Sequence, residues 1–93
     1  MSMTINNQED FRRVQRLVWG KLFGLFIQKG REKRGCTVEE VARLAGMETS
    51  EWLAVEAGCV PDPRQLRPMA DALALGYDKI AMLAVLCRDA WEQ

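Results

Sequence analysis

The residue types that most often carry enzyme chemistry are scarce in this chain of 93 residues. It contains no histidine, which excludes a serine–histidine–aspartate triad, a cysteine–histidine pair and histidine-ligated metal sites. The three cysteines, Cys36, Cys59 and Cys87, are far apart in the sequence and form no CxxC motif. We interpret them as small apolar residues in a reducing compartment, and we expect no enzyme activity, cofactor or metal ion.

The polar residues whose spacing does suggest a role lie near the middle of the chain. Thr37 and Glu40, three residues apart, form a capping-box pattern that predicts the start of a short helix. Thr49 and Ser50 can cap a second short helix after a turn of about three residues. Residues 37–58 therefore predict a helix-turn-helix, whose second helix enters the DNA major groove in proteins that use it in this way.

The rest of the chain predicts further helices and no sheet. Apolar residues recur at intervals of three or four from residue 8 to about 33, and again in 63–76 and 78–93. No segment alternates with the period of two that a strand requires. A helix interior disfavours glycine, so Gly20 predicts either a break or the close approach of another backbone. We predict an all-α fold of five or six helices, with Asp78 capping the last one.

The first and last predicted helices carry more apolar surface than a domain of this size needs. The first has one stripe at helical spacing and a second on its other faces: Phe11, Val14, Val18, Leu22 and Leu25, then Trp19, Phe23, Phe26 and Ile27. The large apolar residues beyond the needs of a five-helix core are Trp19, Phe23, Met82, Leu86 and Trp91. Residues 8–22 and 78–93 are therefore candidate dimerisation helices, and we expect a homodimer. Residues 1–7 are expected to be flexible.

The charges balance overall but are distributed unevenly. The 13 basic and 13 acidic residues give no net charge, so the chain lacks the basic footprint of many nucleic-acid-binding proteins. Eight basic and three acidic residues lie in 1–35, a net charge of +5, and five basic and ten acidic residues lie in 36–93, a net of −5. Lys21 interrupts the richest apolar window, residues 17–27, which is too short to span a bilayer. With no visible signal peptide, we expect a soluble cytoplasmic protein without a membrane partner.

A series of residues at fixed spacing follows the pattern of a known family. The matching positions are Phe23-Gly24, Ile27, Arg31, Gly35-Cys36-Thr37, Val41-Ala42, Ala45-Gly46-Met47, Trp52, Glu56, Gly58, Pro63, Leu66, Ala70 and Leu73. In this register the chain resembles the XRE or Cro/repressor-like helix-turn-helix proteins from Phe23 to about Leu83. The resemblance implies a lambda-repressor-like fold with an added helix at each end of the chain.

The resemblance also implies an ion pair and a set of DNA-contacting positions. Arg31 and Glu56 would form a buried or half-buried pair that ties the first helix to the recognition helix, about 49–57. The fork of an arginine suits a carboxylate that would be costly to bury alone. The positions expected to contact bases or the phosphate backbone are Thr37, Arg43, Thr49, Ser50, Leu53, Ala54, Arg64 and Arg67.

Two functions are compatible with these residues. The resemblance predicts a non-catalytic transcription regulator that binds double-stranded DNA. However, Thr49 and Ser50 can make few hydrogen bonds to bases, and residues 37–57 hold one basic and five acidic side chains, a net charge of −4 that repels phosphate. The alternative is a degenerate helix-turn-helix domain that binds another protein without sequence-specific DNA binding.

Overall fold

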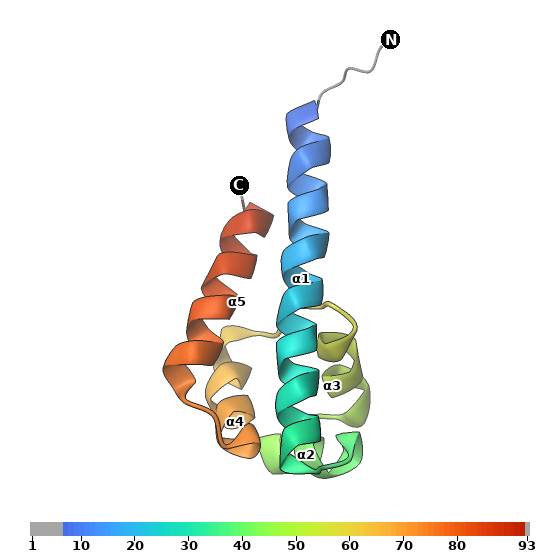
Figure 1. The fold of residues 1–93 in the computed structure, drawn as a ribbon, viewed down its shortest axis with the longest axis vertical. Coiled ribbons are helices and arrows are strands. Elements are labelled where there is room, and N and C mark those ends of the chain that lie inside the picture. The colour runs from blue at the N-terminus through green and yellow to red at the C-terminus, as the bar shows by residue number, and fades with distance from the viewer. Residues whose placement is uncertain (1–6, 93) are drawn as a thin grey trace.

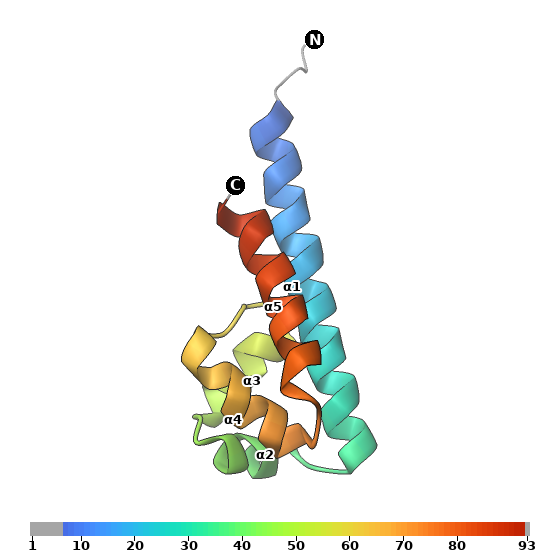
Figure 2. The same ribbon diagram turned by 90° about the vertical axis from the view of Figure 1, so that its left-hand side faces the viewer.

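The computed structural model describes the backbone of residues 7–92 and the side chains of residues 13–15 and 17–86. These residues form five helices and no strand: α1 (Asn7–Arg34), α2 (Val38–Ala45), α3 (Thr49–Glu56), α4 (Pro63–Leu73) and α5 (Tyr77–Glu92). α1 runs the length of the molecule, α5 lies beside it, and the three shorter helices pack around its C-terminal half (Figures 1 and 2). The predicted all-α fold is confirmed. Of the segment expected to be flexible, residues 1–6 lie outside the described residues and Asn7 begins α1.

The N-terminal segment forms one continuous helix of 28 residues, without a break at Gly20. Near Gly20 a second backbone lies against it, which is one of the two outcomes that the sequence predicted. A Cβ atom on Gly20 would collide with the carbonyl oxygen of Gly58, and one on Gly24 would lie 2.6 Å from the carbonyl oxygens of Val55 and Glu56. The two glycines therefore allow the C-terminal end of α3 to pack directly on the backbone of α1.

Two predicted helix starts are wrong by a residue or two. Thr49 is the first residue of α3, and the residue before it, Glu48, is the N-cap. The side chain of Glu51 accepts a hydrogen bond from the backbone N–H of Glu48 at 2.9 Å, so a carboxylate satisfies this donor and neither Thr49 nor Ser50 is the cap. α5 begins one residue before Asp78, which therefore lies in the first helical turn. A negative charge there still complements the helix dipole.

α4 ends earlier than its apolar pattern predicted. It begins at Pro63 with Asp62 as its N-cap, as the proline suggested, but its last helical residue is Leu73. The C-cap is Ala74, in the left-handed conformation with φ of 56°, and not Gly76. The short turn that follows reverses the chain direction and places α5 alongside α1 (Figure 2).

The core is built from large apolar side chains of all five helices. The fully buried ones are Phe23, Ile27, Val41, Trp52, Met69 and Ile80. Phe23 was predicted to be part of an apolar excess, and this is wrong, because it lies in the centre of the core. Trp19 and Phe26 pack against the edge of the same cluster. Of the two apolar stripes predicted on α1, the second is therefore the one that faces the core.

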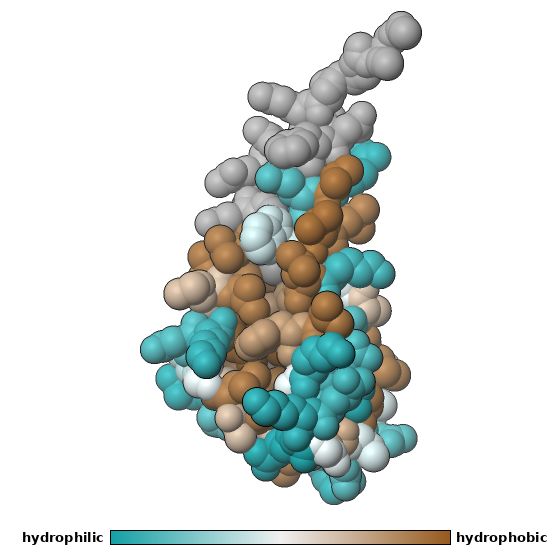
Figure 3. Space-filling view, in the orientation of Figure 1, coloured by the Kyte–Doolittle hydropathy of each residue, from teal (hydrophilic) through white to brown (hydrophobic). Residues whose placement is uncertain are grey.

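The other stripe of α1 faces solvent. Its side chains are about half exposed at Val14, Val18, Leu22 and Leu25, and the side chain of Phe11 lies outside the described residues. On α5, Met82 and Leu86 are exposed, as predicted, whereas the side chains of Cys87 and Trp91 are not among those described. Figure 3 shows hydrophobic residues over both helices on the face turned to the viewer. α1 thus carries apolar side chains on its solvent side as well as on its core side.

Candidate nucleic-acid interface

α2 and α3 form the predicted helix-turn-helix. The turn runs from Gly46 to Glu48, and Gly46 adopts the left-handed conformation, with φ of 70°, that ends α2. Met47 is buried, which holds the turn against the core. Trp52 and Val55 of α3 point into the same core, so the opposite face of α3 is turned to solvent.

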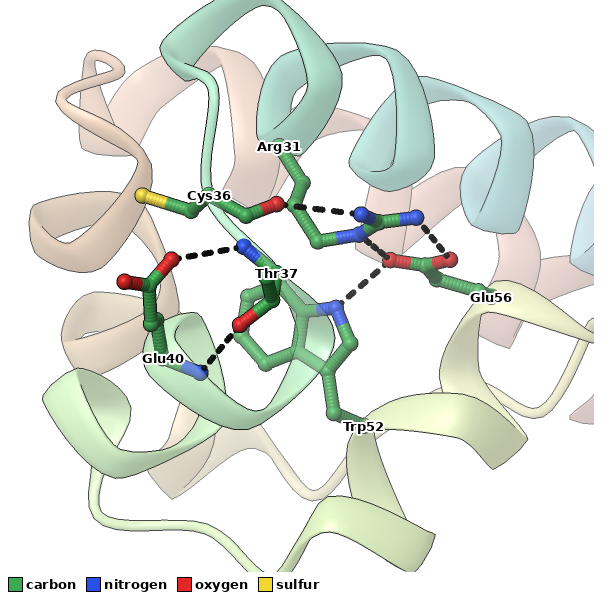
Figure 4. A network of polar contacts seen from close by, with 6 residues as sticks. All are labelled: Arg31, Cys36, Thr37, Glu40, Trp52 and Glu56. Carbon is green, nitrogen blue, oxygen red and sulfur yellow. Dashed lines mark hydrogen bonds and ion pairs between the residues drawn. The ribbon is translucent and has the colours of Figure 1, made fainter.

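A polar network fixes α3 relative to α1 (Figure 4). The Nε atom of Arg31 donates to Oε2 of Glu56 at 2.6 Å, and Nη2 donates to Oε1 at 3.2 Å. The third arginine donor, Nη1, bonds the carbonyl oxygen of Cys36 at 3.1 Å. The ion pair implied by the resemblance is thus present, and it connects α1, the turn before α2, and α3. The hydrogen bonds to Glu56 raise the pKa of Arg31, although burial acts in the opposite direction.

Trp52 is a member of this network that the sequence analysis missed. Its Nε1 atom donates to Oε2 of Glu56 at 2.7 Å. The indole is fully buried, so its N–H needs an acceptor, and the carboxylate one helical turn later supplies it. The spacing of four residues between Trp52 and Glu56 was the available signal, but the sequence analysis used Trp52 only as a matching position of the family pattern.

The N-terminus of α2 is closed by its own side chains. The backbone N–H of Thr37 donates to Oε1 of Glu40 at 2.8 Å, and the N–H of Glu40 donates to Oγ1 of Thr37 at 3.1 Å, as the capping-box pattern predicted. Hydrogen bonding of the Glu40 carboxylate to the backbone N–H of Thr37, and then to the Thr37 side chain, lowers the pKa of Glu40. The carboxylate therefore occupies the helix N-terminus, where a DNA phosphate would otherwise accept hydrogen bonds.

The predicted base-contacting residues share the outer face of α3. Ser50 and Leu53 are exposed, and Thr49 and Ala54 are half-buried beside them. The exposed fraction of Leu53 is 50%, so half of this apolar side chain is open to solvent. Glu51 is exposed next to this face. The surface thus offers two hydroxyl groups, two apolar side chains and a flanking carboxylate.

Two of the three arginines predicted near the DNA backbone have partners within the chain. Nε of Arg64 lies 3.2 Å from Oδ1 of Asp62, and the hydrogen bond to this carboxylate raises the pKa of Arg64. The guanidinium carbon of Arg67 lies 4.5 Å from the centroid of the Tyr77 ring, in a cation–π contact. Arg43 is exposed in the last turn of α2. Such surface contacts are weak, so all three side chains can reorient toward a ligand.

Other kinds of site find no support in the described residues. No three potential metal ligands gather there, and Cys36 and Cys59 are free thiols, half-buried and exposed respectively. None of the helices in the described part of the chain has the length and hydropathy that crossing a bilayer requires.

The family comparison covers this whole site. Residues 22–83, about two thirds of the chain, match the helix-turn-helix domain family. No match was found among curated proteins or solved structures. The matched segment includes the network around Arg31 and the exposed face of α3, but it leaves out the first part of α1 and the end of α5. It supports a helix-turn-helix family in general and does not single out the XRE/Cro branch. The chain belongs to the helix-turn-helix domain family.

Proposed function

We propose that this chain is a non-catalytic transcription regulator of the XRE/Cro-repressor type that binds double-stranded DNA. The observation that carries the proposal is the way α3 is held. Trp52, Val55 and the bonds from Arg31 to Glu56 fix its inner side, and its outer face remains open to a ligand. Helix-turn-helix domains that bind DNA insert the corresponding helix into the major groove.

The chemistry of the outer face suggests how DNA would be contacted. The hydroxyls of Thr49 and Ser50 each suit one hydrogen bond to a base edge, and Leu53 and Ala54 suit the methyl group of thymine. Arg43, Arg64 and Arg67 would contact phosphates, whereas the N-terminal end of α2 at Thr37 is already capped by Glu40. No long amide or basic side chain is available on this face of α3 for a bidentate contact to a purine. We therefore expect weak sequence preference, strongest for sites that contain thymine.

The charge around α3 limits the affinity. Four exposed glutamates surround the two helices: Glu39, Glu40, Glu48 and Glu51. With three arginines available for phosphate, the logarithm of the association constant should fall against the logarithm of the salt concentration with a slope of about −3 or shallower. DNA binding should therefore be detectable at low salt and weak at physiological salt.

Fluorescence anisotropy with pooled random duplex DNA across a salt series tests this proposal. Replacing Arg64 by alanine should weaken binding to all sequences and reduce the slope by roughly one, because one phosphate contact is lost. Arg13→Ala is the matched control. It removes an exposed arginine from the N-terminal half of α1, outside the helix-turn-helix, and should leave the slope unchanged.

Absence of any salt-dependent binding at low salt would contradict the DNA proposal. The acidic surroundings and the exposed Leu53 would then favour the alternative of a protein-interaction module. In that case Leu53→Lys should abolish a protein contact and leave the fold intact, because the side chain is half exposed and lies on the outer face of α3.

A further inference from the structure

Two apolar faces have no partner among the side chains that the structure describes. On α1 the exposed stripe lines a shallow hollow of about 310 Å³, formed by Leu17, Val18, Lys21, Leu22 and Leu25. On α5 a second hollow of about 500 Å³ is formed by Asp78, Ala81, Met82, Val85 and Leu86. Figure 3 shows hydrophobic residues of both helices on the same side of the molecule.

These faces exceed what the helix-turn-helix fold needs. The exposed fractions of Leu17 and Met82 are 61% and 66%, and exposed apolar residues accompany them from Val14 to Leu25 on α1 and from Met82 to Leu86 on α5. Part of the surface, including Leu17, Val18 and Val85, lies outside the family-matched residues 22–83. Contiguous apolar surface of this kind is typical of protein–protein contacts.

The position of Lys21 indicates which surfaces pair. It is the one charged residue that lines the α1 hollow, together with Leu17, Val18, Leu22 and Leu25. If two copies packed this hollow against itself around a two-fold axis, each Lys21 would face the same lysine of the other copy. Two like charges would then be placed together in an apolar interface, which is strongly unfavourable.

The hollow on α5 offers the complementary charge. It combines the carboxylate of Asp78 with apolar side chains, as the α1 hollow combines one lysine with apolar side chains. We propose that two copies of this chain form a symmetric dimer in which α1 of each copy packs on α5 of the other, with Lys21 facing Asp78. Each contact occurs twice around the two-fold axis, so both apolar faces of both copies are covered.

The dimer leaves the candidate nucleic-acid interface open. α3 turns Trp52 and Val55 to the core, and its exposed Ser50 and Leu53 line neither hollow. The inference therefore does not depend on DNA binding, and it can be tested without DNA.

Light scattering of the full chain gives the first test. We expect a mass of about twice the 10.6 kDa of one chain. Leu17→Lys should shift the protein to monomer at a concentration at which the parent protein is a dimer. The matched control is Leu44→Lys, because Leu44 of α2 is 60% exposed, close to the 61% of Leu17, but lies outside both faces. A monomeric parent protein, or a dimer that survives Leu17→Lys, would overturn the proposal.

A charge exchange tests the pairing of α1 with α5. Lys21→Asp and Asp78→Lys should each raise the dimer dissociation constant by roughly tenfold or more, because each places like charges together twice. In an equal mixture of the two variants, the new aspartate faces the new lysine and the unchanged pair meets at the other contact. The mixture should therefore form a heterodimer of about parental affinity.

Two results of this charge exchange would overturn the proposed pairing of α1 with α5. If Asp78→Lys alone leaves the dimer intact, α1 is pairing with α1 and not with α5. If each variant is weakened but the mixture does not recover, the two residues do not face each other. Because Asp78 also lies in the first turn of α5, circular dichroism of each variant must first show parental helix content.

Discussion

Glu56 is the residue on which the position of α3 depends most. Its carboxylate accepts hydrogen bonds from Nε and Nη2 of Arg31 and from Nε1 of Trp52. The side chains of Arg31 and Glu56 are only 15% and 10% exposed. An ion pair of this kind adds little stability relative to well-packed apolar residues, but removing one partner leaves the other charge buried and unpaired.

A double-mutant cycle tests whether Arg31 and Glu56 depend on each other. Arg31→Met and Glu56→Met should each lower the free energy of unfolding by on the order of 3 kcal/mol, because each leaves one charge without its partner. The double variant should lose clearly less than the two single losses combined, since no unpaired charge remains. Urea denaturation measures all four proteins. Additive losses would mean that the two side chains act independently.

The capping box of α2 predicts a pH dependence. Hydrogen bonds from Thr37 lower the pKa of Glu40, so the folded state binds this proton more weakly than the unfolded state. The resulting stabilisation is complete above the unfolded pKa, about 4.3, and is lost as the pH falls through the lower folded pKa. Between about pH 5 and 3, the melting temperature of the parent protein should therefore fall further than that of Glu40→Gln. Glu39→Gln is the control, because it removes a carboxylate from the same turn and leaves the hydrogen bonds between Thr37 and Glu40 in place. The melting temperature of Glu39→Gln should fall over this pH range as far as that of the parent protein.

The sequence predicted those side-chain contacts that depend on local spacing or on the family register. Thr37 with Glu40 follows from a three-residue interval, and Arg31 with Glu56 follows from the resemblance. The contact of Arg67 with Tyr77 could not be predicted, because it depends on how the start of α5 is placed over α4. Tertiary placement of this kind leaves no local pattern in a single sequence.

At the scale of the helices, close packing of α3 on α1 depends on glycine. A Cβ on Gly24 would lie 2.6 Å from two backbone carbonyl oxygens, which cannot move without shifting α3. Gly24→Ala should therefore destabilise the fold by about 2–3 kcal/mol, even though alanine favours a helix more than glycine does. Thermal unfolding measures the change.

Gly30 is the control for this substitution on the same helix. A Cβ there would come closest to the end of the Leu75 side chain, at 3.3 Å, which is half-buried and can adjust, and would meet Leu73 at ordinary contact distances of 3.7 and 3.8 Å. Gly30→Ala should be neutral, or should stabilise α1 by up to about 1 kcal/mol through helix propensity alone. If both substitutions were tolerated equally, the packing argument would be wrong.

The C-terminal end of α4 provides a second prediction at this scale. Ala74 is the one non-glycine residue with positive φ in the described part of the chain, and this conformation strains a side chain with a Cβ atom. Ala74→Gly should raise the free energy of unfolding by about 0.5–1 kcal/mol. Gly46→Ala, the reverse change at the left-handed C-cap of α2, should lower it by a similar amount. If Ala74→Gly lowered the free energy of unfolding, the argument that the backbone at Ala74 is strained would be wrong.

Helix positions were largely predictable, but helix ends were less so. Apolar periodicity located α1, α4 and α5, candidate capping residues located α2 and α3, and glycine correctly marked the end of α2 at Gly46. The predicted ends failed where an unusual residue takes the capping position, as Glu48 does before α3 and Ala74 does after α4. Propensity assigns these positions to Thr49 and Gly76, whereas the chain geometry around the turns selects their neighbours.

At the scale of the whole molecule, the sequence did not predict which apolar side of α1 is buried. Periodicity identifies two stripes but does not rank them, because both have helical spacing. The structure places Phe23 and Ile27 in the core and leaves Leu17 and Leu25 at the surface. The choice depends on the two glycines, which bring α3 against one side of α1 and so direct the adjoining apolar side chains inward.

The exposed stripe has a consequence for the stability of the whole molecule. If the second copy covers it, folding and association are linked, and the melting temperature must rise with protein concentration. We expect this rise for the parent protein and for Leu44→Lys, which leaves both apolar faces intact. Leu17→Lys should melt at a temperature that does not change with concentration, because its monomers no longer associate. Differential scanning calorimetry over roughly a hundredfold concentration range distinguishes these cases, since only an associating protein gains stability by mass action. A concentration-independent melting temperature of the parent protein would mean that the apolar face of α1 is exposed in the folded state in solution.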